Sequence, residues 1–184
     1  LDHPGRVERL ALLDIMPTIS MWESMNAMRA MQVYHWTFLA QPEPVPERLL
    51  KTDPIPWLDH CIASWTKAKS LDAFDPLAME SYRDSFNDPA RIHAACEDYR
   101  AGATTDPEHD RIDLAAGKRI LCPVLALWGD AGIPGKGASP LDLWRATFAP
   151  QAQGQAIDSG HFLPEENPAA TLAALTPFLA APGS

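Results

Sequence analysis

The sequence has few cysteines and no long apolar run. Cys61, Cys96 and Cys122 are odd in number, lie far apart and form no C-x-x-C pair, so neither a disulfide framework nor a zinc site is indicated. No apolar stretch approaches the roughly 20 residues of a membrane span, and the first residues, Leu1 to Arg6, lack the basic-then-apolar layout of a signal peptide. These absences predict a cytoplasmic protein that has no membrane partner.

Positive charge is also scarce. The chain has 15 Lys and Arg against 24 Asp and Glu, a formal net charge of −9 at pH 7. This excess disfavours nucleic acid and anionic membranes as partners, although a few local donors could still hold a small anionic substrate. A chain of 184 residues with 46% hydrophobic content is expected to fold as a globular unit.

A third absence concerns catalysis. The chain contains no Gly-x-Ser-x-Gly elbow and no version with Asp or Cys at its centre. Such an elbow would present a nucleophile on a strand-to-helix turn. The sequence also begins without Met, in what reads as a helix-to-strand connection. We therefore expect the chain to be the C-terminal part of an enzyme, and we expect these residues alone to be inactive and poorly folded.

Three short apolar runs are typical of buried parallel strands, at residues 7–15, 123–128 and 154–157. A first helix is predicted from Ser20, which forms a capping-box pattern with Glu23, to the Tyr34-His35-Trp36 cluster. Further helices are predicted at residues 57–69, 76–86, 89–100, 140–148 and 168–179. Strands separated by helices indicate the α/β class with a parallel sheet.

The helical block after the first strand is far longer than an ordinary crossover connection. Residues 17–118 are therefore predicted to form an inserted helical cap. Residues 1–16 would then be a core strand, and residues 119–184 the C-terminal part of the core.

Polar residues follow the predicted strands at the edge where function collects in parallel sheets. Asp14 ends the first run, Asp130 follows the second, and His161 follows the third. An imidazole can accept a proton at neutral pH, and a carboxylate on its other ring nitrogen fixes its tautomer. The sequence predicts such a pair at His161, with Asp14 and Asp130 as the two candidate carboxylates.

Five motifs taken together resemble the fluoroacetate (haloacetate) dehalogenases of the α/β-hydrolase fold. They are Leu13-Asp14-Ile15, Tyr34-His35-Trp36, the segment Cys96 to Gly102, Leu127-Trp128-Gly129 and Ser159-Gly160-His161-Phe162. Ser-Gly-His-Phe occurs in many hydrolases, whereas His-Trp on one cap helix with Asp-Tyr-Arg-Ala on a later one is narrower. The resemblance implies the C-terminal portion of such an enzyme, including its cap.

The resemblance implies hydrolysis of short haloacids through an Asp-ester intermediate, with the nucleophile upstream of Leu1. His161 would be the base, and the Leu-Asp-Ile context favours Asp14 over Asp130 as its partner. The family resemblance also implies a homodimer with neither a metal nor an organic cofactor.

His35, Trp36 and Tyr99 match the halide-binding residues of the family. Fluoride is a poor leaving group, so the charge that develops on it needs preorganised N–H and O–H donors, which these side chains carry. Singly, each of these residue types is more often found in core packing. Arg100 is a further candidate anion ligand, although an Arg in this position is typically held in a salt bridge.

Other functions are compatible with the same residues. An epoxide hydrolase would need tyrosine donors from the cap, for which Tyr34, Tyr82 and Tyr99 are available. A serine esterase would differ in its elbow residue, which lies outside this chain. A non-catalytic fragment or binding module is the alternative outside enzymes.

Overall fold

The computed structural model describes residues 1–132 and 139–181, which form two compact units. One unit contains the sheet and comprises residues 1–17, 65–73 and 113–184. The other is helical and comprises residues 18–64 and 74–112. The assignment of the helical unit as an inserted cap stays a prediction.

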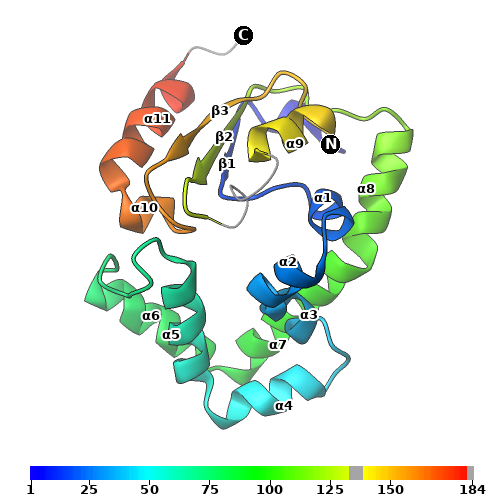
Figure 1. Cartoon of the computed structure of the whole chain (residues 1–184). Helices are drawn as coiled ribbons and strands as arrows, with labels where there is room; N and C mark the ends of the chain where they lie inside the picture. The colour runs from blue at the N-terminus through cyan, green and yellow to red at the C-terminus, as the bar shows by residue number, and fades with distance from the viewer. Residues whose placement is uncertain (133–138, 182–184) are drawn as a thin grey trace. The chain divides into compact units, whose positions relative to one another are not determined.

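The sheet unit has three parallel strands in the order β1-β2-β3 (Figure 1). Its elements are η1 (Pro4–Arg6), β1 (Leu10–Leu13), β2 (Val124–Gly129), α9 (Pro140–Ala146), β3 (Gln153–Ile157), α10 (Leu163–Glu166) and α11 (Pro168–Ala180). In the register, Leu12 lies beside Ala126 and Ala126 beside Gly154. The predicted α/β class with a parallel sheet is confirmed.

The two faces of the sheet are covered by different helices. Leu12 and Val124 pack with Leu141 and Trp144 of α9. Residues that alternate with them along the strands pack with α10 and α11 instead; they are Leu13, Leu125 and Leu127. Because successive side chains of a strand point to opposite faces, α9 and α11 lie on opposite sides of the sheet.

β1 is shorter than the apolar run that predicts it. The run covers residues 7–15, but Val7 and Ile15 are each 45% exposed and only Leu10–Leu13 pair with β2. Asp14 ends the strand because its backbone takes the left-handed conformation, with φ of 50°. This turn directs the chain away from the sheet immediately after Leu13.

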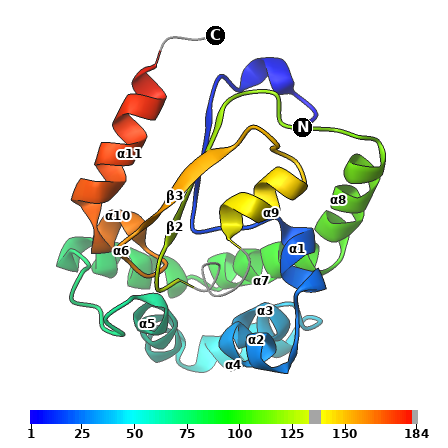
Figure 2. The ribbon, with the colours of Figure 1, turned by 45° about the horizontal axis from the view of Figure 1, so that its top comes forward.

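The helical unit is built around α7. Its elements are α1 (Thr18–Glu23), α2 (Ala27–Gln32), α3 (Tyr34–Leu39), α4 (Val45–Thr52), α5 (Pro54–Trp65), α6 (Pro76–Phe86), α7 (Pro89–Ala103) and most of α8 (Thr105–Ala115). α7 packs against α3, α4 and α6 (Figure 2). Its buried residues Ile92 and Cys96 share an apolar cluster with Leu39 and Leu50. Asp75 and Asp88 cap α6 and α7, each followed by a proline in the first turn.

The prediction of one continuous helix from Ser20 to the Tyr34-His35-Trp36 cluster is wrong. The segment forms three short helices, α1 to α3, and Ser20 lies inside α1 instead of capping it. Asn26 interrupts the helix with an extended backbone, and its side chain accepts a hydrogen bond from Arg29 N at the start of α2. A side chain that satisfies a free backbone N–H in this way starts a new helix.

The predicted end of the helix that contains Trp57 is also wrong. The sequence predicts that this helix reaches residue 69, but α5 ends at Trp65. The backbone of the next residues makes tertiary hydrogen bonds: Trp65 O accepts from His161 N at 2.9 Å, and Lys67 N donates to Glu166 at 2.7 Å. Lys69 has a φ of 58°, which an α-helix does not contain. These long-range partners, invisible in local sequence, end the helix.

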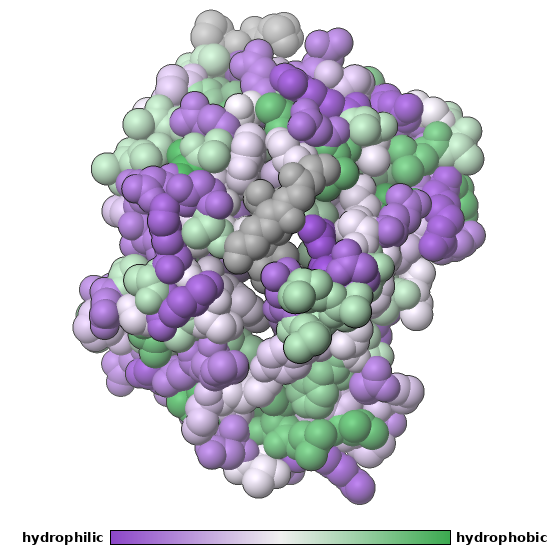
Figure 3. All heavy atoms as spheres, in the orientation of Figure 1, coloured by the Kyte–Doolittle hydropathy of each residue, from purple (hydrophilic) through white to green (hydrophobic). Residues whose placement is uncertain are grey.

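Polar and apolar side chains are mixed on the face of the molecule that Figure 3 draws. Met28, Met31, Leu49 and Leu77 are exposed apolar residues of the helical unit. Among the residues that the structure describes, no helix is both long and apolar enough to cross a membrane.

Alanine is expected to have opposite effects on the free energy of unfolding at two glycine positions. At Gly160, a Cβ would lie 2.4 Å from Lys67 N and 2.5 Å from Trp65 O, so Gly160→Ala should lower the free energy of unfolding by about 1–3 kcal/mol or more. Gly102 lies in α7 with nothing within 4 Å of its Cβ position, so Gly102→Ala should raise stability by about 1 kcal/mol. Chemical unfolding of both variants, made in the longer enzyme that the sequence predicts, checks this pair, and equal effects would contradict the close packing at Gly160.

Candidate active site

Asp14 is held rigidly at the carboxyl end of β1. Its backbone N–H donates to Leu127 O at 2.7 Å, and its Oδ1 accepts from Gly129 N at 2.8 Å. The residue is 1% exposed. Asp is one of the few residue types that tolerate a left-handed backbone. A Cβ at Gly132 would lie 2.7 Å from Asp14 Oδ1, so the carboxylate also requires glycine there.

His161 follows β3 and meets this carboxylate. Its Nδ1 lies 2.7 Å from Asp14 Oδ2. An ionised carboxylate only accepts hydrogen bonds, so Nδ1 carries the hydrogen and Nε2 keeps a free lone pair. The His161 side chain is 39% exposed whereas that of Asp14 is fully buried. The buried charge thus fixes the ring, and the ring remains accessible.

Trp65 borders the imidazole in the same unit. Its ring meets that of His161 edge to face, with centroids 5.8 Å apart, and it stacks on Phe162 at 6.2 Å. Its carbonyl also accepts the His161 N–H at 2.9 Å. No local pattern in the sequence identifies Trp65 as a neighbour of His161, because the contact joins residues nearly a hundred positions apart.

Asp130, the alternative partner for His161, has another role in the described structure. Its two carboxylate oxygens accept from Lys67 Nζ at 2.8 and 2.9 Å. The Lys67 ammonium that donates to this carboxyl lowers the pKa of Asp130. Lys67 Nζ also pairs with Asp158. The structure therefore brings Asp14 to His161 and Asp130 to Lys67.

The three predicted halide-binding residues lie together in the helical unit. His35 and Trp36 come from α3, and Tyr99 comes from α7. The Tyr99 ring meets both others edge to face, with centroid distances of 5.7 Å to His35 and 5.8 Å to Trp36. Burial raises the pKa of Tyr99 to about 12, so its hydroxyl keeps its proton at neutral pH. This cluster combines an indole N–H and a phenol O–H.

Arg100 and Tyr34 are engaged by other protein groups. Arg100 Nε donates to Gln41 O at 2.9 Å, and its guanidinium pairs with Glu47 and Glu97. This is the salt-bridged state that the sequence also allowed. The Tyr34 hydroxyl lies 3.7 Å from Cys61 Sγ, and burial raises the pKa of Tyr34 to about 12.

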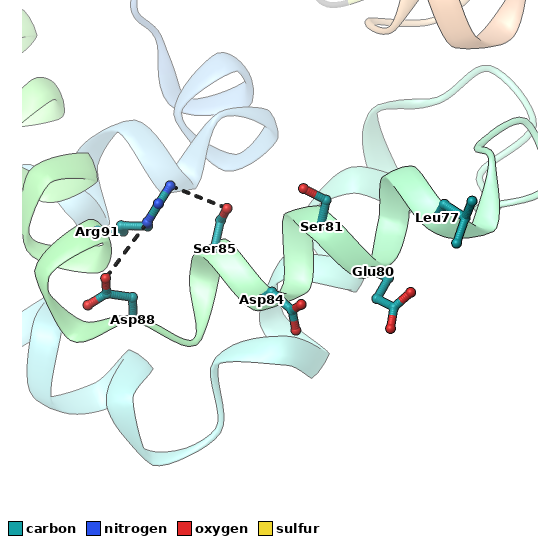
Figure 4. Close-up of a pocket in the computed structure, with 7 residues that line it drawn as sticks. All are labelled: Leu77, Glu80, Ser81, Asp84, Ser85, Asp88 and Arg91. Atoms are coloured by element: carbon teal, nitrogen blue, oxygen red, sulfur yellow. Dashed lines mark hydrogen bonds and ion pairs between the residues drawn. The ribbon is translucent and has the colours of Figure 1, made fainter.

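A surface hollow of about 430 Å³ lies along α6 and the start of α7 (Figure 4). Three of its seven lining residues are acidic, and Arg91 bridges Asp88 and Ser85 at its edge. None of the predicted site residues lines it. Within residues 1–132 and 139–181, no group of three or more His, Cys, Asp or Glu side chains is arranged to hold a metal ion.

Similarity to known proteins extends over nearly the whole chain. The chain is 39% identical over 179 residues to a fluoroacetate dehalogenase from Burkholderia sp. The match covers 97% of this chain and 58% of the relative. A solved structure from Nostoc sp PCC 7120, described as an α/β hydrolase, superposes on the chain with a TM-score of 0.92 at 46% sequence identity. The match covers 98% of this chain and 60% of the Nostoc chain. Together with the parallel sheet, these matches decide the fold.

The chain has the α/β-hydrolase fold. A second α/β structure, from Pseudomonas aeruginosa and described as an epoxide hydrolase, has a TM-score of 0.89 at 41% identity, covering 97% of this chain and 59% of its own. No family model matches the chain. The predicted resemblance of this α/β-hydrolase chain to fluoroacetate dehalogenases is confirmed, and the chain spans 58% of the length of that relative.

Proposed function

We propose that the chain contributes the base, its orienting carboxylate and the halide-binding donors of a hydrolytic dehalogenase acting on short haloacids such as fluoroacetate. The nucleophile of this enzyme would lie outside the 184 residues. The observation that carries the proposal is the 2.7 Å contact between His161 Nδ1 and Asp14 Oδ2, in a chain 39% identical to a fluoroacetate dehalogenase. The same similarity supports the hydrolase class.

The proposed reaction has two steps. A carboxylate oxygen of the nucleophile attacks the α-carbon of the haloacid, a C–O bond forms, and the C–halogen bond breaks to release halide. In the second step His161 Nε2 takes a proton from water, which attacks the ester carbonyl. The ester bond between the acyl carbon and the alkoxy oxygen breaks, and the hydroxyacid leaves with the proton that His161 returns. The second proton of the water passes to solvent as the nucleophile regains its carboxylate form.

Asp14 supports the second step electrostatically. When His161 takes a proton, the imidazole becomes positive next to a buried carboxylate 2.7 Å away. Asp14 therefore stabilises the charge that develops on the ring and keeps Nε2 as the accepting nitrogen. Gly129 N donates to the other carboxylate oxygen, so Asp14 cannot rotate freely out of this position.

The cluster of His35, Trp36 and Tyr99 is proposed to serve the first step. Halide leaving from carbon gains negative charge, and hydrogen-bond donors fixed in advance lower the energy of that transition state. The edge-to-face packing of Tyr99 on His35 and Trp36 limits the movement of all three rings. The proposal uses neither a metal nor an organic cofactor, and the homodimer and the cytoplasmic location stay predictions.

An epoxide hydrolase is the second candidate, because the Pseudomonas aeruginosa structure described as one is 41% identical to the chain. An epoxide hydrolase would also form an ester on the nucleophile and use the same base, but it needs tyrosine hydroxyls to protonate the oxygen of the epoxide ring. The Tyr34 hydroxyl already contacts Cys61. Parallel assays of fluoroacetate and a small epoxide separate the two candidates.

Replacement of His161 should stop the reaction halfway. In an enzyme comprising these residues and the N-terminal half that the proposal requires, His161→Asn should release one equivalent of halide and then accumulate the covalent ester. Attack on carbon precedes the step that needs the base. Intact-protein mass spectrometry after incubation with fluoroacetate should show the added mass. Multiple turnover at the parent rate would remove His161 from the mechanism.

Loss of one halide donor should depend on the halogen. One transition-state hydrogen bond is worth about 2.7–4 kcal/mol, so Trp36→Phe should lower fluoroacetate turnover on the order of a hundredfold. Bromoacetate turnover should fall much less, because bromide is the better leaving group. Steady-state rates for both substrates on one folded variant cancel any general destabilisation.

Trp22→Phe is the matched control. The Trp22 ring also packs on Trp36, but its indole N–H donates to Gly102 O at 2.6 Å. This variant should affect both substrates equally. A uniform loss in Trp36→Phe as well would mean that Trp36 only packs.

A further inference from the structure

Three consecutive backbone N–H groups around the imidazole have fixed acceptors. Gly160 N donates to Glu166 Oε2 at 2.9 Å, and Phe162 N donates to Glu166 Oε1 at 3.1 Å. Between them, His161 N donates to Trp65 O at 2.9 Å. One carboxylate therefore holds the residue on each side of His161.

The same carboxylate reaches a distant part of the chain. Glu166 Oε2 also accepts from Lys67 N at 2.7 Å. A single ionised group thus receives three backbone hydrogen bonds, which are stronger than bonds between neutral groups. Glu166 is the last residue of α10 and reaches back to Phe162 at the N-cap, much as the acidic residue of a capping box does.

Residues 65–73 support the loop of residues 158–162 that carries His161, which we call the histidine loop. There is no room for a side chain at Gly160, because a Cβ would lie 2.4 Å from Lys67 N. The Lys67 side chain binds Asp130 and Asp158, which follow β2 and β3. The Glu166 carboxylate joins residues 65–73 to both neighbours of His161 through its hydrogen bonds.

We propose that Glu166 is a positioning residue for His161: its carboxylate sets the loop so that Nδ1 stays on Asp14 and Nε2 faces the ester. This inference rests on the proposed function. Glu166 acts through the backbone and does not touch the substrate. Its effect should therefore fall on the water-dependent second step and spare the first release of halide.

Glutamine at this position tests the charge and the acceptor pattern without changing the size. A glutamine has one acceptor oxygen and one NH₂ donor, so whichever way it turns, its NH₂ faces at least one backbone N–H that Glu166 now accepts. Glu8→Gln, at an exposed position of the same unit, makes the same chemical change and is the matched control.

The experiment compares the enzyme with its Glu166→Gln and Glu8→Gln variants in two measurements. The first is rapid-quench kinetics with fluoroacetate, which separates the burst of halide release from steady-state turnover, with the ester followed by intact mass. Glu166→Gln should keep the burst, accumulate ester and lower the steady-state rate on the order of a hundredfold, as expected for a base misplaced by about 1 Å. Glu8→Gln should match the parent.

The second measurement is the proton resonance of the imidazole Nδ1–H that is bonded to Asp14, assigned by its loss in His161→Asn. It requires no turnover. The resonance should persist in Glu8→Gln and broaden or vanish in Glu166→Gln.

These measurements separate the two proposals. A parent enzyme that releases no halide contradicts the proposed function, and the resonance still decides the role of Glu166. An unchanged resonance with an unchanged ester level in folded Glu166→Gln overturns the positioning role, as does an equal loss in burst and steady state. If Glu166→Gln does not fold, Glu166→Asp, which keeps the charge but shortens the reach, is judged by the same criteria.

Discussion

The hydrogen bond between Asp14 and His161 is the interaction on which the candidate site depends. A fully buried carboxylate is costly unless several donors compensate it, and here Gly129 N and the imidazole do so. Three parallel strands bring these groups together at one edge, since Asp14 follows β1, Gly129 ends β2 and His161 follows β3. The pairing of the strands therefore also sets the relative positions of the site residues.

Close backbone approaches protect this arrangement. A Cβ at Gly129 would lie 1.9 Å from Gly160 O, and one at Gly132 would meet the Asp14 carboxylate. Gly129, Gly132 and Gly160 therefore stand where the ends of β2 and β3 meet the histidine loop. Glu166 and the 65–73 segment then hold the loop from the other side. Rigid supports of this kind suit the role proposed for His161, which must present one nitrogen in one direction.

Sequence reasoning found what local patterns encode and missed what distant contacts impose. The apolar runs predicted all three strands, and the tips of those runs predicted that a carboxylate would meet His161, with Asp14 favoured by family resemblance. The same reasoning extended α5 beyond Trp65, because the acceptors that end the helix lie in the histidine loop. Glu166 was missed for a related reason. An acidic residue after a Leu-Pro pair reads as an ordinary helix residue until its three backbone donors are known.

The rate of ester hydrolysis in Asp14→Asn and Asp130→Asn tests the central claim most directly. An amide cannot fix the imidazole in the same tautomer, and such a change lowers turnover by roughly ten-thousandfold in a comparable triad. Decay of the covalent adduct, followed by intact mass in a single turnover, should slow by a factor of that order in Asp14→Asn. It should slow by less than about tenfold in Asp130→Asn, which removes the negative charge that pairs with Lys67. A larger effect in Asp130→Asn, or equal effects in both, would contradict the account.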